Sequence, residues 1–234
     1  MQIFYTPDVS EGKALFSREE SVHCLRVLRM RRGDGISFTD GLGNLYEGII
    51  SGDDPAGMTA TVSSVQHDER RRGYRLHMAI SPLKNEDRLE WFIEKAVEIG
   101  IEEITPLICT RTEKRRFRRE RLEGLILSAM KQSVKYWLPL LNEPVAFNGF
   151  LDGEHPGKKI IACCDHDIKR IPLTSAFSRG ESVTILIGPE GDFTAEEVTS
   201  AVRTGFAAVH IGESRLRTET AGVAACCSVY LANI

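Results

Sequence analysis

Two strongly apolar runs restrict the fold of this chain more than any other feature of its sequence. Residues 159–163 and 183–187 each contain four apolar side chains in five positions, so they lack the alternation of a strand with one solvated face. Strands of this kind are buried on both faces, as in parallel sheets whose connections are helices. We therefore predict an α/β fold with a largely parallel sheet that helices cover on both faces.

The rest of the C-terminal part has the same alternating order. Strands are expected at 76–80 and 104–108, and the helix between them ends at Gly100. Its apolar face recurs at helical spacing and consists of Leu89, Phe92, Ile93, Ala96 and Val97. Another helix is expected from Arg118 to about Val134. Strands that alternate with helices are typical of an α/β domain.

The N-terminal part is predicted to be a small, mostly β domain. Strand patterns follow one another at 35–40, 44–50 and 59–65. One helix is expected at 19–30, because apolar residues recur there at a three-residue spacing. The stretch 67–73 is polar and charged, so we place the domain boundary there. The predicted domains are residues 1–72 and 73–234.

The composition of the 234 residues narrows the class of protein. A hydrophobic fraction of 42% can build a core without metals or disulfides, and no apolar stretch approaches the roughly 20 residues of a membrane span. The six cysteines include no Cys-x-x-Cys pair, so we expect reduced thiols and no metal site. The N-terminus lacks the features of a signal peptide, which makes a cytoplasmic location the expectation.

Basic side chains gather locally on a chain whose net charge is −3. Residues 114–121 carry six basic side chains in eight, and Arg70-Arg71-Arg72 is a second cluster. Near the N-terminus His23, Arg26 and Arg29 recur at a three-residue spacing. Such patches are compatible with a specific RNA contact, whereas the net charge argues against coating nucleic acid by bulk electrostatics. A solvated surface without a partner is the alternative.

A glycine-containing loop follows the apolar run 183–187 directly. Its sequence is Gly-Pro-Glu-Gly-Asp-Phe at 188–193, and a capping box at 194–197 starts a helix after it. Ligands bind at the carboxyl ends of strands in open α/β sheets, and glycines let backbone groups approach them. The loop matches neither the GxGxxG nor the Walker A pattern, so neither a dinucleotide nor a nucleoside triphosphate is indicated. A tight turn without a ligand stays open as the alternative.

A second polar segment joins the expected strand 207–211 to an alanine-rich helix that runs to the C-terminus. It contains Gly-Glu-Ser-Arg-Leu-Arg-Thr-Glu-Thr-Ala at 212–221. Arg217 and Glu219 then lie at the N-terminal end of the helix, where charge can be presented to a ligand. An ordinary capped terminal helix is the alternative.

Together the two segments resemble the signature of the 16S ribosomal RNA (uracil-N3)-methyltransferases, a family of the knotted SPOUT class. The resemblance covers nearly the whole chain: residues 23–43 resemble the family's PUA-like RNA-binding barrel, and residues 95–111 resemble the start of its catalytic domain. The departures from the family pattern are Asp192 in place of a glycine, Lys131 in place of an acidic residue, Val134 and Lys135 in place of a small residue and an arginine, and the segment 211–214.

The resemblance implies a fold, a cofactor and partners. The fold is a SPOUT trefoil-knotted parallel sheet preceded by a small PUA-like β-barrel. S-adenosylmethionine would bind in the knot loops, without a metal, in a homodimer whose site includes residues of both chains. The substrate would be 16S rRNA of the small ribosomal subunit. The implied cofactor-binding residues are Leu186, Gly188, Glu190, Gly191, Ile211, Gly212, Leu216, Thr218 and Ala221.

The implied reaction is methyl transfer to N3 of a uridine, which must lose its N3 proton. We hypothesise Glu219 as base or positioning group, with Glu190 as the alternative acceptor, and Arg217 as the group that stabilises charge on the carbonyl oxygens. Alternatively, Arg217 and Glu219 mainly order the knot through hydrogen bonds. The candidates for RNA contacts are His23, Arg26, Arg29, Arg111, Lys114, Arg115 and Arg116.

Three other functions stay open at this stage. Another SPOUT methyltransferase, acting on ribose 2′-oxygen or on transfer RNA, would differ in its product nucleoside. A non-catalytic ribosome-assembly factor would bind RNA but no cofactor. An α/β enzyme for a small metabolite would need a nucleophile–base pair, and none stands out in the sequence.

Overall fold

The computed structural model describes residues 2–68, 72–115, 117–164 and 168–234. The chain divides into two compact units, one made of Met1–Arg71 with Leu127–Leu138 and the other of Arg72–Ile126 with Pro139–Ile234. The first unit therefore includes a segment from the middle of the chain. Among the described residues, no helix combines the length and the apolar composition that a membrane crossing needs.

The first unit is built on a six-stranded sheet with the order β1-β4-β5-β6-β3-β2. The strands are β1 (Phe4–Tyr5), β2 (Val9–Ser10), β3 (Lys13–Leu15), β4 (Gly35–Thr39), β5 (Asn44–Gly52) and β6 (Thr59–His67). The three strands expected from the sequence are confirmed as β4, β5 and β6. Phe4, Phe16 and Phe38 form the centre of the core, with ring centroids 6.4 Å and 5.2 Å apart in edge-on contacts.

The helix expected near the N-terminus is shorter than predicted and changes form. The α-helix α1 covers only Arg18–Val22, and a π-helix, η1, follows at His23–Val27. Arg29 lies beyond both and has a φ of 59°. A π-helix turns differently from an α-helix, so the spacing of His23, Arg26 and Arg29 does not place them along one α-helical face.

Backbone hydrogen bonds attach the segment Leu127–Leu138 to the sheet of the first unit. The carbonyl oxygen of Tyr136 accepts from the N–H of Gly43 at 2.8 Å and from the hydroxyl of Thr39 at 3.2 Å. A Cβ atom on Gly43 would lie 2.2 Å from the ring of Trp137, so this approach requires glycine.

Three residues that depart from the family pattern, Lys131, Val134 and Lys135, lie in this segment. Lys131, in the last turn of helix α3 (Arg119–Gln132), forms an ion pair with the buried carboxylate of Glu20. Val134 follows with a φ of 55°. The lysine that replaces an acidic residue thus has an acidic partner in the same unit.

The second unit contains a parallel sheet of eight strands with the order β10-β8-β7-β13-β11-β14-β12, while β9 also pairs with β8. The strands are β7 (Leu76–Ile80), β8 (Glu103–Ile108), β9 (Leu140–Leu141), β10 (Val145–Ala146), β11 (Lys158–Ala162), β12 (Ile171–Pro172), β13 (Val183–Ile187) and β14 (Ala207–His210). The two apolar runs form the neighbouring central strands β11 and β13, and every residue of β13 is buried.

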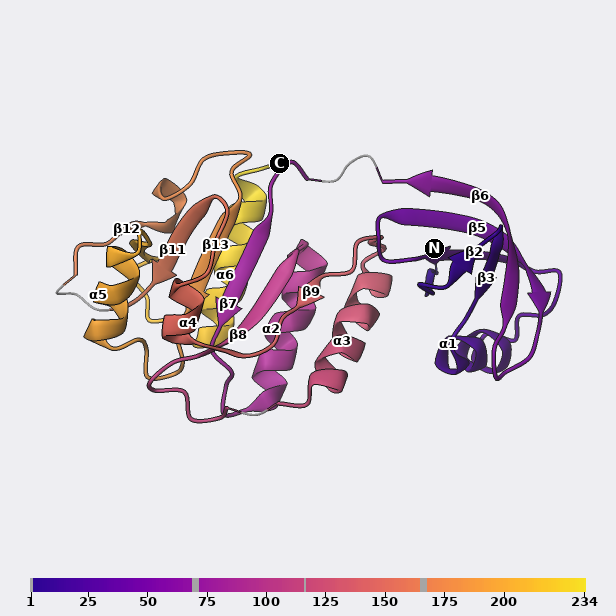
Figure 1. The fold of residues 1–234 in the computed structure, drawn as a ribbon, viewed down its shortest axis with the longest axis horizontal. Helices are drawn as coiled ribbons and strands as arrows, with labels where there is room; N and C mark the ends of the chain where they lie inside the picture. Colours follow the sequence, from indigo (N-terminus) through magenta and orange to yellow (C-terminus); the bar gives the residue numbers. More distant parts are fainter. Residues whose placement is uncertain (1, 69–71, 116, 165–167) are drawn as a thin grey trace. The chain divides into compact units, whose positions relative to one another are not determined.

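Helices cover both faces of this sheet (Figure 1). They are α2 (Glu86–Ile99), α4 (Phe147–Leu151), α5 (Ala195–Arg203) and α6 (Thr218–Leu231), and a 3-10 turn, η2 (Leu173–Ser175), lies between β12 and β13. α4 and α5 pack over Ala79, Ile161 and Leu186. On the other face α2 packs against α6, where a Cβ atom on Gly222 would lie only 2.6 Å from the Phe92 ring.

The chain crosses the sheet between β14 and α6. β14 lies beyond β11 in the strand order, on the side away from β13. α6 follows β14 in sequence, yet it packs against β13 and β7. Residues 211–217 therefore carry the chain back past β11, at the carboxyl ends of the strands.

A buried polar cluster closes the opposite, amino edge of the same sheet. His77 Nε2 and the Thr105 hydroxyl are 2.7 Å apart, and His77 Nδ1 lies 3.5 Å from Glu103 Oε2. The Asn142 amide donates to Glu103 and to Thr105, each at 2.7 Å. Burial lowers the pKa of His77 to about 4, so the imidazole is neutral at neutral pH.

Candidate active site

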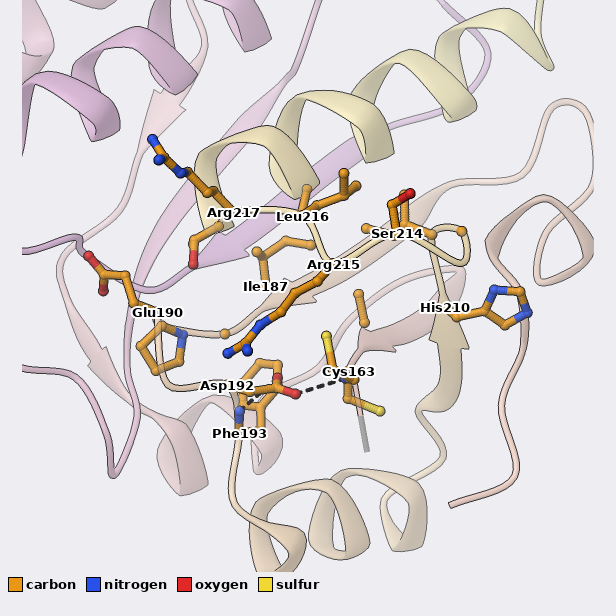
Figure 2. A pocket seen from close by; sticks show the side chains of 18 of the residues that line it. Cys163, Ile187, Glu190, Asp192, Phe193, His210, Ser214, Arg215, Leu216 and Arg217 are labelled. Carbon is orange, nitrogen blue, oxygen red and sulfur yellow. Dashed lines mark hydrogen bonds between the residues drawn. The ribbon is translucent and has the colours of Figure 1, made fainter. Parts of the chain in front are cut away.

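A cavity of ≈ 580 Å³ opens at the carboxyl edge of the parallel sheet (Figure 2). Its walls come from the end of β11, the loop 188–193 after β13, the crossing segment 210–217 and the first turn of α6. Arg88 of α2 and Arg111, which follows β8, complete it. The size is typical of a pocket for a cofactor or a small molecule.

The structure brings together most of the residues that the sequence singled out. Those that line the cavity are Arg111, Gly188, Glu190, Ile211, Gly212, Leu216, Arg217, Thr218 and Ala221. Two segments some 20 residues apart in sequence thus form one site, because β11 and β13 are neighbours and the crossing segment passes both.

Leu186 does not line the cavity, although the sequence analysis placed it among the cofactor contacts. Alternate side chains of a strand point to opposite faces of the sheet, and Leu186 points into the core beneath α4 and α5. Its neighbour Ile187 faces the cavity instead. The one-residue error arose because the apolar run alone does not reveal which residue faces which side.

The loop 188–193 is held in place by polar contacts on both sides. Arg111 donates to the carbonyl oxygens of Gly191 at 2.6 Å and of Phe193 at 3.3 Å. Gly191, like Leu186, is not among the residues that line the cavity, and a Cβ atom there would lie 3.3 Å from Arg111 Cδ. The backbone N–H of Lys84 donates to Glu190 at 3.1 Å. These contacts within the protein hold the shape of the loop.

Asp192 links this loop to the segment after β11 (Figure 2). One carboxylate oxygen accepts from the N–H of Cys164 and the other from the N–H of Phe193, both at 2.8 Å. Asp192 has a φ of 61°, a region that favours glycine. Burial, and next the charge of Asp192, raise the pKa of the Cys164 thiol. The departure from the family's glycine thus introduces a side-chain tie between two walls of the cavity.

The predicted capping box at the start of α5 is confirmed. Thr194 Oγ1 accepts from the N–H of Glu197, and the Glu197 carboxylate accepts from the N–H of Thr194. Glu197 also accepts from the N–H of Thr110 at 2.8 Å. These bonds fix the helix end that follows the cavity loop.

The crossing segment leaves open space at Gly212, where no atom lies within 4 Å of a Cβ position. Arg215 is exposed, and Figure 2 shows its side chain extending toward Asp192. Arg217 is the N-cap residue of α6 and is also exposed. Arg215 is not among the site residues that the sequence predicts, although it stands between the candidates Gly212 and Leu216.

Glu219 lies behind the cavity wall, in the first turn of α6. Its side chain is 9% exposed, and within the described residues its Oε2 atom has no hydrogen-bond partner. Arg88 Nε is 3.8 Å from the other oxygen, Oε1. Sequence reasoning missed Arg88, because a single arginine on a distant helix carries no local signal.

Positive charge dominates the cavity. Among the described residues, five arginines line it, namely Arg88, Arg111, Arg170, Arg215 and Arg217, against the two carboxylates of Glu190 and Asp192. Within the described ranges, no group of three or more His, Cys, Asp or Glu side chains is arranged to hold a metal ion. An anionic substrate and a ligand with a cationic centre both find complementary charges here.

The candidates for RNA contacts are distributed over both units. His23, Arg26 and Arg29 lie in the first unit, and Arg26 and Arg29 are exposed. In the second unit Lys114 pairs with Glu86 at 2.5 Å, and Arg115 is exposed. Arg116, like Arg70 and Arg71, lies outside the described residues.

Comparisons with known proteins agree with this architecture. A model of the RNA methyltransferase domain matches residues 70–230, and a model of the RNA methyltransferase PUA domain matches residues 16–62. The ribosomal RNA small subunit methyltransferase E of Synechocystis is 27% identical over 202 residues, which are 84% of this chain and 65% of the relative. This chain thus matches just under two thirds of that relative's length.

Solved structures extend the similarity to the whole chain. A Porphyromonas gingivalis protein described as a "probable rRNA-methyltransferase" is 37% identical, with a TM-score of 0.92 over 100% of this chain and 98% of that chain. The ribosomal RNA small subunit methyltransferase E of Neisseria gonorrhoeae, solved with S-adenosylmethionine bound, is 25% identical with a TM-score of 0.84 over 100% and 98%. The predicted α/β fold class is confirmed: a parallel sheet flanked by helices follows a PUA-like N-terminal sheet, as in SPOUT structural neighbours. The chain belongs to the RNA methyltransferase family, with a PUA-like N-terminal unit and a SPOUT catalytic fold.

Proposed function

We propose that this protein transfers a methyl group from S-adenosylmethionine to N3 of a uridine in 16S rRNA of the small ribosomal subunit. The observation that carries the proposal is the cavity at the carboxyl edge, where both signature segments meet in a member of the RNA methyltransferase family. The names of the relatives point to small-subunit ribosomal RNA, and the Neisseria gonorrhoeae structure holds the cofactor in the same fold.

The residues of the cavity fit this cofactor. Ile187, Ile211 and Leu216 offer an apolar wall for an aromatic base, and the open space at Gly212 exposes backbone groups to its polar edge. Glu190 provides a negative charge for a cationic centre. We assign the binding of S-adenosylmethionine to Gly188, Glu190, Gly191, Ile211, Gly212, Leu216, Thr218 and Ala221, with Ile187 in the place first given to Leu186. When bound, the cofactor supplies a methyl group on a sulfonium, which needs no metal for its activation.

Two tasks then fall to the side chains of this protein. The target uracil must be held with N3 in the reacting position. Such orientation lowers the activation barrier by roughly several kcal/mol in favourable cases. Its N3 proton must also leave, and a carboxylate beside the site can accept it. The burial of Glu219 and the unpaired Oε2 atom favour this residue over the exposed Glu190. Arg217 stabilises the negative charge that develops on the uracil carbonyl oxygens.

The RNA and the quaternary structure complete the proposal. Residues 1–72 form the RNA-binding domain and residues 73–234 the catalytic domain. His23, Arg26, Arg29, Arg111, Lys114, Arg115 and Arg116 contact the RNA backbone. Their replacement weakens binding and reduces its salt dependence. The protein acts in the cytoplasm as a homodimer.

The test is methyl transfer from labelled S-adenosylmethionine to small ribosomal subunits that lack base methylation, with mass spectrometry of the digested nucleosides. We expect 3-methyluridine. A different methylated nucleoside would retain the SPOUT methyltransferase and discard the proposed target atom. No transfer together with no cofactor binding would favour an assembly factor without catalysis.

A further inference from the structure

Glu219 is a buried carboxylate in the first turn of α6; it does not itself line the cavity. The side chain of Glu219 is 9% exposed, and its Oε2 atom has no hydrogen-bond partner in the described part of the chain. Buried polar atoms are nearly always paired, so an exception next to a cavity points to a donor that the protein itself does not supply. Thr218 and Ala221, on either side of Glu219 in α6, both line the cavity.

Arg88 stands at the other oxygen of this carboxylate. Its Nε atom lies 3.8 Å from Glu219 Oε1, which is within ion-pair range but too long for a hydrogen bond. The arginine therefore balances the charge of Glu219 and leaves the lone pairs of the carboxylate available. The Arg88 side chain is 39% exposed and lines the cavity, so it extends from the buried carboxylate to the open site.

We propose that Arg88 is the positioning residue of Glu219: it stands at Oε1 and orients the buried carboxylate so that Oε2 accepts the N3 proton of the target uracil. The inference rests on the function proposed above. In this step the N3–H bond breaks, the proton passes to Oε2, and the electron pair of that bond stays on N3. The N-terminus of α6 acts in the same direction, because helix N-termini favour negative charge.

Arg217 is less suited to this role, although it is two residues from Glu219. It is exposed, and among the described residues no ion pair joins it to Glu219. Residues two apart on a helix do not face each other. Arg88 and Arg217 therefore have separate tasks, the first toward the carboxylate and the second toward the substrate.

The experiment compares Arg88→Gln, Arg88→Lys, Glu219→Gln and the double variant Arg88→Gln/Glu219→Gln in the full-length protein. We expect Arg88→Gln to lower kcat about 100-fold, the scale of a lost proton-transfer or electrostatic contribution. KM for the small subunit and Kd for S-adenosylmethionine, measured by calorimetry, should stay unchanged. Arg88→Lys keeps the charge and should recover part of the loss. The double variant should be no slower than Glu219→Gln, because the two residues act as one unit.

Thermal unfolding gives a readout that does not depend on turnover. Arg88→Gln leaves a buried carboxylate without its cation and should lower the melting temperature, and adding Glu219→Gln should restore it. The matched control is Arg75→Gln, because Arg75 also pairs with a largely buried carboxylate, Glu103 Oε2 at 2.9 Å, on the opposite edge of the sheet. This control should keep the wild-type kcat.

The outcomes separate the inference from the proposed function. A wild-type protein that makes no 3-methyluridine overturns the function, and the inference with it. An active wild type with normal kcat in Arg88→Gln overturns the inference alone. The inference is also overturned if Arg88→Gln weakens cofactor or RNA binding and leaves kcat unchanged. It is overturned as well if the effects of Arg88→Gln and Glu219→Gln on kcat and on the melting temperature are additive.

Discussion

The two edges of the parallel sheet both hold buried polar side chains, and they differ in how those side chains are paired. At the amino edge His77, Glu103, Thr105 and Asn142 bond to one another. At the carboxyl edge the Oε2 atom of Glu219 has no partner within the described residues. Buried polar groups that satisfy one another stabilise a fold, whereas an unpaired one next to a cavity is available to a ligand.

The difference follows from how parallel strands are connected. At the carboxyl edge the chain leaves β11, β13 and β14 through loops that diverge around a cavity. At the amino edge side chains of β7 and β8 meet the residue that follows β9, and no opening separates them: His77 is 8% exposed. Burial alone does not distinguish the two edges, because Glu219 is 6% exposed. The unpaired Oε2 atom of Glu219 does, since other buried groups at the carboxyl edge are paired, as Ser81 is with Thr112 at 2.7 Å.

The largest effect that distinguishes the edges is expected at Glu219. Glu219→Gln removes the proton acceptor while keeping the shape of the side chain, so kcat should fall by about 10²–10⁴-fold. Cofactor affinity, measured by calorimetry, should not change. The comparison variant is Glu103→Gln, which disturbs a saturated cluster and should lower the melting temperature with kcat retained. Full turnover of Glu219→Gln with normal cofactor affinity would rule out the role as base.

The next effect concerns the amino edge and depends on pH. His77 has a folded-state pKa of about 4, below its ordinary value of 6.5, so the unfolded chain binds the extra proton between these pH values. The free energy of unfolding should therefore fall as the pH drops from about 6.5 to about 4, by up to about 3 kcal/mol, and gain nothing more from this group above 6.5. Urea unfolding at several pH values measures this change in the free energy of unfolding.

His77→Gln isolates the contribution of this histidine from that of the carboxylates that also titrate in acid. The variant should lose stability at neutral pH, where the cluster is intact, and should show a flatter dependence between pH 4 and 6.5. Parallel curves for the two proteins would mean that the imidazole is hydrated in the folded state. The amino edge would then be open, and the contrast between the edges would not hold.

Sequence reasoning reached the carboxyl edge because its signals are local. Gly188, Glu190 and Arg217 stand in short segments next to strand and helix ends, so their approach follows from the parallel sheet. Arg88 had no such signal, because it meets Glu219 only through the packing of α2 on α6. The amino-edge cluster went unnoticed for the same reason, since His77 and Asn142 lie in different elements that only the sheet brings together.

The sequence also did not predict several details of local backbone geometry. Ile187 and not Leu186 lines the cavity, because the two side chains point to opposite faces of the sheet. A strand that is apolar on both faces does not indicate which face each residue occupies. The π-helix at His23–Val27 broke the α-helical spacing expected for the basic stripe. The attachment of Leu127–Leu138 to the first unit depends on contacts such as Gly43 against Trp137, which join residues far apart in sequence.

Two glycines test a related contrast, with a smaller expected effect. Gly222 lies in the packed interior and Gly212 at the open cavity. A Cβ atom on Gly222 would lie 2.6 Å from the Phe92 ring, so Gly222→Ala should destabilise the protein by about 1–3 kcal/mol through overpacking. Gly212 has no neighbour within 4 Å of its Cβ position, so Gly212→Ala should leave stability unchanged and weaken cofactor binding. Equal melting temperatures for the two variants would contradict the difference in packing.

The smallest effect is expected at Asp192, which stands where the family has a glycine and whose carboxylate accepts a hydrogen bond from the N–H of Cys164 in another wall of the cavity. Asp192→Gly relieves a φ of 61° but removes the bond to the Cys164 N–H, so the two changes in stability should nearly cancel. The cavity walls lose their mutual support, and a less preorganised site binds more weakly. We expect Kd for S-adenosylmethionine to rise about tenfold, or about 1.4 kcal/mol.

Glu11 provides the matched control for this substitution. It has a φ of 50° and is exposed on the first unit, so Glu11→Gly relieves similar backbone strain without touching the cavity. This variant should gain slightly in stability and bind the cofactor as the wild type does. If Asp192→Gly behaved in the same way, the carboxylate would be a tolerated replacement of glycine, and the carboxyl edge would keep its shape through the Arg111 contacts to Gly191 and Phe193 instead.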